Sequence, residues 1–398
     1  MKKYWIISEL YHPNENTTAY IITKIAEGLG IYTNVNVITS TSSSIKEVSK
    51  ERINNVTIHR VQDSKLNKNI FLWRILKLII LGLRLFFKSA SLVKKNDTVI
   101  VVTNPATIIF LISILRILKK FELVILVHDV FPENLVVAKV LKSGNFLYKI
   151  TLSLFNWAYR KADKLVVIGR DMDQFMRLKL GSKCPSIVFI PNFADCNEIR
   201  PQPKWQNKIL IENCLCEKFV LLYTGNIGRA QDINNILKTM ELLKKMEKIH
   251  LLIIGDGANT ALVKQFIKEK CLSNITLLPA IAREFSNDFL NAGDIGLVSL
   301  QKGRKGIAVP SKTYTFLAAA KPILAVVDKE SEIYRMVTES NCGWLSDPGE
   351  PASLRDLIIQ ICDSEKEIIT KGVIARNLAL EKYSVEKIIA QFQIILLR

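Results

Sequence analysis

The sequence has few acidic residues, few histidines and no regular cysteine spacing. Its 398 residues contain 37 Asp and Glu against 55 Lys and Arg, which gives a formal net charge of +18. Only four His and seven Cys are present, and no two cysteines have the C-x-x-C spacing. These absences argue against a disulfide framework or a zinc site and favour a reducing compartment. The length predicts two domains rather than one core.

Long apolar runs are also missing. No uninterrupted run reaches the roughly 20 residues that a membrane-spanning helix needs. The start of the chain resembles a signal peptide only superficially, because Glu9 follows a few apolar residues, and we expect a buried strand there. The excess positive charge predicts an anionic partner. Without an aromatic RNA-binding pair or a helix-turn-helix pattern, we expect no nucleic acid, and a membrane surface or phosphorylated ligand instead.

Short apolar runs alternate with longer segments of helical pattern along the whole chain. This alternation is typical of α/β proteins whose parallel sheets are covered on both faces. In the first half we expect strands at Trp5–Ser8, Val35–Thr39, Thr98–Val102, Leu123–Val127, Leu165–Ile168 and Ile187–Ile190. In the second half we expect them at Phe219–Tyr223, Leu251–Ile254, Ile275–Leu278, Ile295–Ser299 and Ile323–Val327.

Residues 65–95 combine eight Lys or Arg with no acidic residue. Four of the cations share one helical face: Arg74, Lys77, Arg84 and Lys88. With Trp73 beside a wide apolar arc, the pattern favours a helix lying in a membrane interface, its cations on anionic headgroups. The alternative is a core helix with one solvated basic stripe. For a second apolar segment, Thr107–Lys120, we expect ordinary burial.

Glycines follow two predicted strands of the second half. One segment contains Gly225, Asn226, Gly228 and Arg229, and the other is Gly255-Asp256-Gly257. Glycines between a strand and a helix let backbone N–H groups approach a phosphate. Each segment alone is also compatible with an ordinary turn.

A third segment, residues 306–325, runs from a glycine-containing loop into a short helix and an apolar strand. Pro310, Ser311 and Lys312 stand where that helix is expected to begin. Free N–H groups at a helix start, beside a cation, favour an anion.

In this order the segments resemble the motifs of GT-B fold glycosyltransferases, family four in particular, and the P-S-K subgroup of surface-polysaccharide type. Leu278-Pro279-Ala280-Ile281 resembles the family segment that holds the nucleotide base. The resemblance implies two Rossmann-like domains facing an interdomain cleft. It further implies a nucleotide sugar as the donor, a UDP-sugar being favoured, with base contacts at Ala280 and Ile281 and no metal or cofactor.

The first half is similar to the family at fewer points. Residues 127–133 resemble the loop that faces the reacting sugar, so His128, Asp129 and Glu133 are the candidate catalytic residues. Asp171-Met172-Asp173 spells a metal motif of another glycosyltransferase fold, but at a helix start it favours capping. Two family glutamates are replaced by Ile307 and Thr315, which leaves Arg229 and Lys312 as the cations for the diphosphate.

The predicted organisation has four parts. Residues 1–200 form an acceptor and membrane-docking domain, 201–217 a linker, 218–380 a nucleotide-sugar domain, and 381–398 a helix returning to the first domain. The predicted activity is configuration-retaining transfer of a sugar to a lipid-linked or surface-polysaccharide acceptor. We expect a cytoplasmic protein, peripheral on the inner membrane face. The alternatives are a sugar-nucleotide epimerase and a catalytically silent membrane-bound partner subunit of the same fold.

Overall fold

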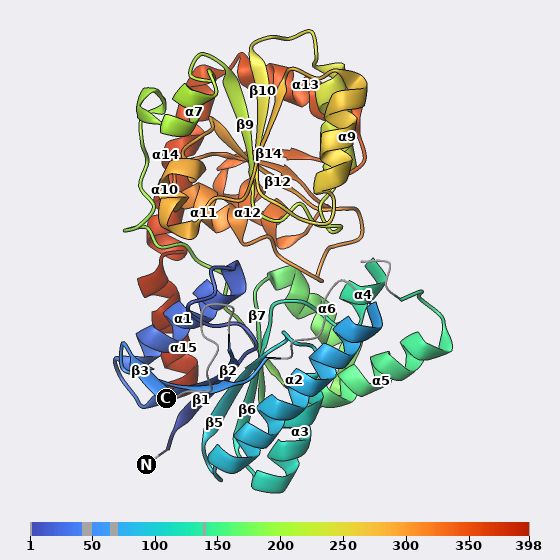
Figure 1. The fold of residues 1–398 in the computed structure, drawn as a ribbon, viewed down its shortest axis with the longest axis vertical. Coiled ribbons are helices and arrows are strands. Elements are labelled where there is room, and N and C mark those ends of the chain that lie inside the picture. The colour runs from blue at the N-terminus through green and yellow to red at the C-terminus, as the bar shows by residue number, and fades with distance from the viewer. Residues whose placement is uncertain (1, 42–49, 64–70, 138–140, 398) are drawn as a thin grey trace. The chain divides into compact units, whose positions relative to one another are not determined.

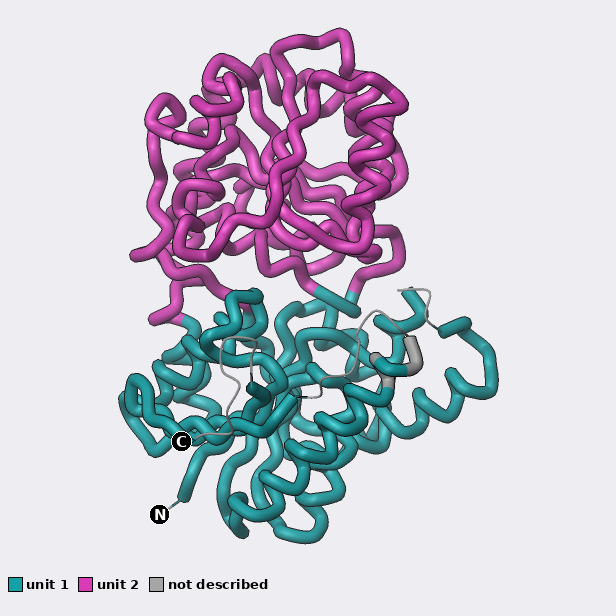
Figure 2. Tube along the Cα trace, in the orientation of Figure 1, with its two compact units in different colours: residues 1–191, 306–308, 388–398 teal, residues 192–305, 309–387 magenta. Residues whose placement is uncertain are grey.

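The computed structural model describes residues 2–41, 50–63, 71–137 and 141–397. The chain divides into two compact units, coloured separately in Figure 2. Unit 1 contains residues 1–191, 306–308 and 388–398, and unit 2 contains residues 192–305 and 309–387. Each unit has its own sheet, with eight strands in unit 1 and six in unit 2, as Figure 1 shows.

The sheet of unit 1 has the order β3-β4-β2-β1-β5-β6-β7-β8. Its strands are β1 Tyr4–Ile7, β2 Val35–Ser40, β3 Lys50–Ile53, β4 Val56–Val61, β5 Thr98–Val102, β6 Glu122–Val127, β7 Lys164–Val167 and β8 Ser186–Phe189. All pairings are parallel except that of β3 with β4. The chain progresses in one direction from β1 to β4 and in the other from β5 to β8. The order therefore reverses between β1 and β5, where such sheets bind ligands.

Two groups of helices cover this sheet. They are α1 Thr17–Gly30, α2 Phe71–Leu92, α3 Ile108–Lys119, α4 Glu133–Val137, α5 Phe146–Arg160, α6 Arg170–Leu180 and α15 Val385–Leu397. Helices α1 and α15 are in close contact, because a Cβ on Gly28 would lie 2.7 Å from Ile389. Right-handed crossovers place α2, α3, α5 and α6 on the opposite face.

The sheet of unit 2 has the order β11-β10-β9-β12-β13-β14, and its strands are all parallel. Its strands are β9 Phe219–Thr224, β10 Ile249–Ile254, β11 Ile275–Leu278, β12 Ile295–Ser299, β13 Ile323–Val326 and β14 Gly343–Ser346. Its helices are α7 Lys208–Glu212, α8 Ile233–Leu242, α9 Thr260–Lys270, α10 Ser286–Leu290, α11 Lys312–Ala318, α12 Glu332–Ser340, α13 Pro351–Cys362 and α14 Glu365–Lys382. Counted along the chain, this is the 3-2-1-4-5-6 order of dinucleotide-binding folds, with its reversal between β9 and β12.

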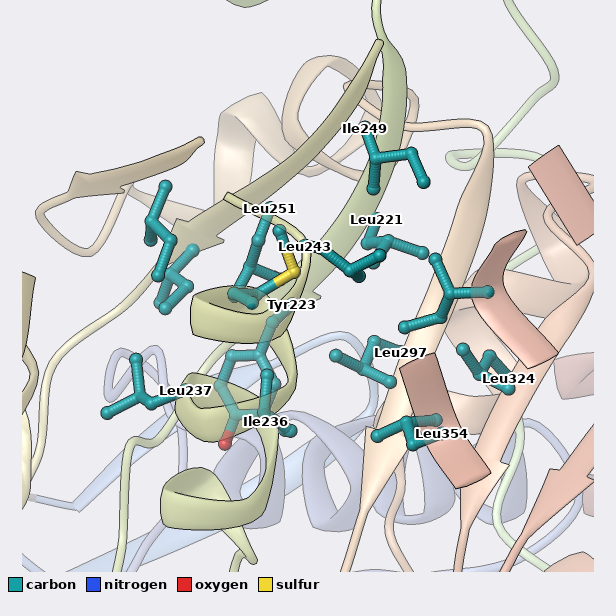
Figure 3. Close-up of a cluster of buried hydrophobic side chains, with 14 of the residues drawn as sticks. Leu221, Tyr223, Ile236, Leu237, Leu243, Ile249, Leu251, Leu297, Leu324 and Leu354 are labelled. Atoms are coloured by element: carbon teal, nitrogen blue, oxygen red, sulfur yellow. The ribbon is translucent and has the colours of Figure 1, made fainter. Parts of the chain in front are cut away.

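Figure 3 shows the core between this sheet and the helices that cover it. Leu221 and Tyr223 of β9 lie with Leu251 of β10 against Ile236 and Leu237 of α8. All are nearly or fully buried, as expected for parallel strands covered on both faces. Because β9 is central and packed from both sides, the turn at its carboxyl end starts from a rigid position.

All the predicted strands are present to within two residues, and the α/β prediction is confirmed. The sequence analysis missed β3, β4 and β14, which lie at or next to a sheet edge and carry exposed or half-buried positions. Residues 201–217, expected as a linker, belong to unit 2 and contain α7. That helix forms because the Asn207 side chain accepts a hydrogen bond from the Leu210 N–H and Leu210 is buried.

The predicted basic helix is present as α2. Residues 65–70 and the side chain of Arg74 lie outside the described residues. Among the helices of the described ranges, none is long and apolar enough to cross a membrane.

Two of the cations predicted to face a membrane have partners within unit 1. The Lys77 ammonium pairs with the Asp63 carboxylate at 2.7 Å, and Arg84 donates to the carbonyl of Gln62 at 2.6 Å. Lys88 is half-buried. Burial of His59 lowers the pKa of the His59 imidazole, and the nearby Lys88 ammonium lowers it further. The basic face of the helix therefore serves contacts within unit 1, and Trp73 lies on the exposed side.

Candidate active site

The turn after β9 stands at the point where the strand order of unit 2 reverses. Gly225 has φ +90°, and no atom lies within 4 Å of the place where a Cβ would be. Its N–H donates to the carbonyl of Ile254, so the turn is anchored to β10 while one side of it stays open. An open backbone turn beside a central parallel strand is the geometry that accommodates a phosphate.

The second glycine pair packs closely against the turn that follows β9. A Cβ on Gly255 would fall on the carbonyl oxygen of Gly225, and one on Gly257 would lie 2.7 Å from the backbone of Ile227. The Asp256 carbonyl accepts from the Ile227 N–H at 2.9 Å. Gly255 and Gly257 thus allow two loops to touch, and they shape the site from behind.

Lys312 is the cation buried closest to this turn. Its ammonium nitrogen lies 3.4 Å from the centre of the Tyr223 ring and has no hydrogen-bond partner in the described parts of the chain. The Tyr223 hydroxyl donates to the carbonyl of Asn226 at 2.8 Å, so one aromatic side chain contacts both the cation and the turn.

Burial lowers the pKa of Lys312 from 10.5 to about 7. No carboxylate compensates the charge, and the ring face contributes only a cation–π attraction. An anion reaching the ammonium would therefore favour its charged form strongly. This makes Lys312 a binding group whose charge depends on the ligand.

Pro310 and Ser311 precede α11, which begins at Lys312 as predicted. The Ser311 hydroxyl does not cap the helix: it accepts no hydrogen bond from the N–H groups of the first turn. Thr315 donates its hydroxyl to the carbonyl of Lys312 at 2.8 Å.

Asp328, which the sequence analysis missed, holds the loop that leads to these residues. One oxygen of its carboxylate accepts the backbone N–H groups of Gly303, Arg304 and Lys305, at 2.7 to 3.1 Å. The only signal for it was an acidic residue directly after a buried strand, β13. The residue positions a loop rather than contacting a ligand.

The other predicted donor-site residues lie at the same carboxyl end of the sheet. Asn226 and Arg229 are exposed on the β9 turn. Asp256 is exposed and accepts from the Gly257 N–H and the Thr260 hydroxyl, which lowers its pKa. Ala280 is exposed and Ile281 half-buried just after β11, leaving backbone groups at the sheet edge.

In unit 1, His128 and Asp129 follow β6. Both backbone N–H groups donate to the Thr103 hydroxyl, at 3.2 and 3.3 Å. Burial lowers the pKa of His128 to about 4, so its imidazole is neutral at physiological pH, and its buried Nε2 has no partner within the described ranges. A neutral imidazole accepts or donates hydrogen bonds but does not supply charge.

Residues 306–308 of the signature segment belong to unit 1. Ala308 pairs with Asp129, and the Val130 N–H donates to the Ile307 carbonyl at 3.1 Å. The Gly306 N–H donates to the buried Asp171 carboxylate at 2.8 Å. Asp171 also accepts from the Met172 N–H in the first turn of α6, but the N-cap of that helix is Gly169 and no side chain caps it.

The Glu133 carboxylate forms a buried ion pair with Lys179 of α6, whose pKa burial lowers. This ion pair connects α4 to α6, and the catalytic role predicted for Glu133 stays a prediction.

Glu9 is a further polar residue that sequence reasoning did not single out. It directly follows β1, at the strand-order reversal of unit 1, and its N–H donates to the Asn104 carbonyl. Burial and then the nearby Asp63 carboxylate raise the pKa of Glu9. A charged residue after an apolar strand was the signal that could have identified it.

Comparison with known proteins agrees with this geometry. The family model described as "Glycosyl transferases group 1" matches residues 218–364. The probable glycosyltransferase WbjE of Pseudomonas aeruginosa is 36% identical over 388 residues, covering 96% of this chain and 95% of WbjE. The Escherichia coli (strain K12) protein named "Putative colanic acid biosynthesis glycosyl transferase WcaI" is 22% identical. The match covers 58% of this chain and 56% of WcaI.

Among solved structures, Anabaena HepE in complex with UDP-glucose matches with a TM-score of 0.75 at 14% identity, covering 100% of this chain and 99% of HepE. Two parallel α/β sheets with this similarity define the GT-B fold. The chain belongs to the group 1 family of glycosyltransferases, and it is a glycosyltransferase.

Proposed function

We propose that unit 2 binds a nucleotide sugar, with a UDP-sugar as the favoured donor, and that the protein transfers the sugar with retention of anomeric configuration. The buried, unpaired ammonium of Lys312 beside the open turn at Gly225 carries this proposal. HepE, which shares the fold, binds UDP-glucose.

The chemistry needs stabilisation of charge more than it needs a reactive side chain. As the sugar departs, negative charge grows on the diphosphate. The open backbone at Gly225, exposed Arg229 and Lys312 would hold that charge. Because Gly225 follows a buried central strand whose Tyr223 contacts Lys312, little reorganisation of these groups would accompany the reaction.

The proposed acceptor is a lipid-linked or surface-polysaccharide sugar, bound by unit 1 at the inner face of the membrane. WcaI, whose name assigns it to colanic acid biosynthesis, supports this class. In unit 1, neutral His128 and the carboxyl group of Glu9 would form hydrogen bonds with hydroxyl groups of the acceptor.

A thermal-shift series tests the donor. Native protein is scanned with UDP-, GDP-, TDP- and ADP-sugars, because a ligand that binds only the folded state raises its melting temperature. We expect one nucleotide class to stabilise the wild type and to lose this effect in Lys312→Met. NMR of the product then reports its anomeric configuration, and inversion would overturn the retaining assignment. Conversion of the free sugar nucleotide without acceptor would indicate an epimerase instead.

A further inference from the structure

Helix α2 has an exposed apolar face. Trp73, Leu76, Ile79, Leu83 and Phe87 are between 41% and 65% exposed. At 3.6 residues per turn they fall within about 120° of the circumference. The exposed apolar side chains of α2 therefore share one face, and the exposed Arg84 lies beside them.

Helix α3 continues this face. Its buried side carries Ile108, Ile112 and Leu115, but Ile117 and Leu118 are 49% and 70% exposed. The ordinary burial expected for this segment therefore describes only one side of the helix.

Helix α5 carries a third apolar row. Phe146, Leu147, Ile150 and Leu154 are all exposed, and their spacing places them within about 100° of one another. Together the three helices hold nearly half of the exposed large apolar side chains in the described parts of the chain.

The three helices are neighbours, as Figure 1 shows. A Cβ on Gly82 of α2 would lie 3.0 Å from the Thr107 hydroxyl at the start of α3, and the Lys119 ammonium at its end donates to the Val93 carbonyl after α2. The rings of Phe110 on α3 and Phe155 on α5 are in tilted contact, with centres 4.6 Å apart. The exposed rows thus form one continuous area, called here the three-helix surface.

The charge on these helices has one sign. None of α2, α3 and α5 contains Asp or Glu, whereas each contains Lys or Arg. Lys149 on α5 and Lys94 and Lys95 after α2 are exposed at its margin. A second copy of the chain would bring like charges together, while anionic lipid headgroups complement them.

We propose that the three-helix surface is the membrane-docking face, and that it binds an anionic bilayer by inserting apolar side chains from all three helices into the interface. Exposed apolar areas this extensive on a monomer mark interaction sites. Apolar insertion supplies most of the binding, and the marginal cations add selectivity for anionic lipid. The inference rests on the membrane location in the proposed function, and it assigns the contact to residues.

Vesicle sedimentation with the full chain tests this. One variant combines Leu83→Glu, Leu118→Glu and Leu147→Glu, one exposed residue from each helix. The control combines Leu262→Glu, Ile369→Glu and Val373→Glu, exposed apolar residues of unit 2 with the same change in charge. With vesicles containing phosphatidylglycerol, we expect the first variant to bind at least tenfold more weakly and the control to bind as the wild type does. Equal loss in both variants would mean that net charge alone drives binding and would overturn the proposal.

Fluorescence of Trp73 reports insertion directly. Brominated lipids should quench wild-type emission, and Trp73→Phe should remove most of that quenching. Absence of quenching would overturn the proposal. So would a dimer in solution, if the triple variant of the three helices dissociated it without altering vesicle binding. These readouts use no sugar nucleotide, so a protein that binds vesicles but no donor would refute the proposed function alone.

Discussion

The two units have related strand orders but different turns at the point where each order reverses. In unit 2, β9 ends in Gly225, which has a positive φ and an open side, and Arg229 follows. In unit 1, β1 ends at Ile7, and Ser8 and Glu9 follow with no glycine; the Ser8 hydroxyl donates to the Leu10 carbonyl at 2.9 Å. The turn after β9 leaves its backbone accessible, whereas the turn after β1 uses its polar groups in hydrogen bonds within the turn.

The buried ionisable groups at these two places have opposite sign. Burial lowers the pKa of Lys312 in unit 2 and raises that of Glu9 in unit 1. The first group would gain from an anion and the second from a hydroxyl or a cation. The same topology thus supplies two ligand positions, and the side chains decide which ligand each accepts.

The largest expected effect comes from closing the gap behind the unit 2 turn. Gly255→Ala places a methyl group on the Gly225 carbonyl oxygen, and we expect it to lower the free energy of unfolding by about 3 kcal/mol. Gly225→Ala is the matched control, because its methyl group enters open space and costs only the strain of positive φ, about 1 kcal/mol. Urea denaturation measures both, and equal losses would contradict the packing role of Gly255.

Removing the charge of Lys312 should nearly abolish turnover. Lys312→Met keeps the length of the side chain but removes a cation from the diphosphate, and we expect kcat to fall about a hundredfold. Lys302→Met, an exposed change on the same loop, should leave turnover unchanged. A kcat for Lys312→Met within threefold of wild type would show that the buried ammonium does not act on the donor.

The pH dependence of donor binding should sharpen the assignment. Lys312 has a pKa of about 7 without ligand, and an anion raises it, so binding above pH 7 takes up a proton. Affinity should therefore fall as the pH rises above 7, by up to about tenfold per unit, and should be flat in Lys312→Met. Titration calorimetry in buffers of different ionisation enthalpy counts the protons.

The same linkage predicts the stability of the free protein. Because the unfolded chain restores the ordinary pKa of 10.5, it binds one more proton than the folded state between pH 7 and 10.5. The contribution of Lys312 to the free energy of unfolding should thus rise with pH across that window. A wild-type curve parallel to that of Lys312→Met would argue against a lowered pKa.

The smallest expected effect is in unit 1. Glu9→Gln keeps the shape of the side chain but weakens one hydrogen bond to an acceptor hydroxyl, worth about 1 kcal/mol, so kcat/KM for acceptor should fall about fivefold. Donor affinity should not change, and Glu15→Gln, an exposed change nearby, should affect neither. A shift in donor affinity with Glu9→Gln would place the residue in a different role.

Strands and turns could be predicted from the sequence because their signals are local. An apolar run followed by glycine fixes where β9 ends and where the Gly225 turn begins. The roles of Gly255 and Gly257 could not be predicted, because each packs against a backbone atom 30 residues away in the chain. Phosphate-binding turns and close-packed turns use the same residue type.

The orientation of α2 shows a second limit of sequence reasoning. Helical periodicity correctly indicated that Lys77 and Arg84 share one face of the helix. It could not indicate that this face meets Asp63 and the carbonyl of Gln62, because those partners lie beyond a segment with no readable pattern. The cations were predicted to contact lipid headgroups, and the contacts of Lys77 and Arg84 within unit 1 were not foreseen.

The division of α15 has a consequence for the order in which the protein folds during synthesis. From Ile388 onward the helix belongs to unit 1, where Ile389 meets Gly28 and the Ile395 carbonyl accepts from Lys164 at 2.9 Å. Ile388, Phe392 and Leu396 are buried there. Residues 1–191 therefore leave the ribosome before the part of α15 that packs against α1 has been made. Unit 2 is translated later but can complete its core before unit 1 does. The part of α1 that packs against α15 stays exposed for the whole of that interval, and we expect the nascent chain to bind chaperones that hold apolar surfaces.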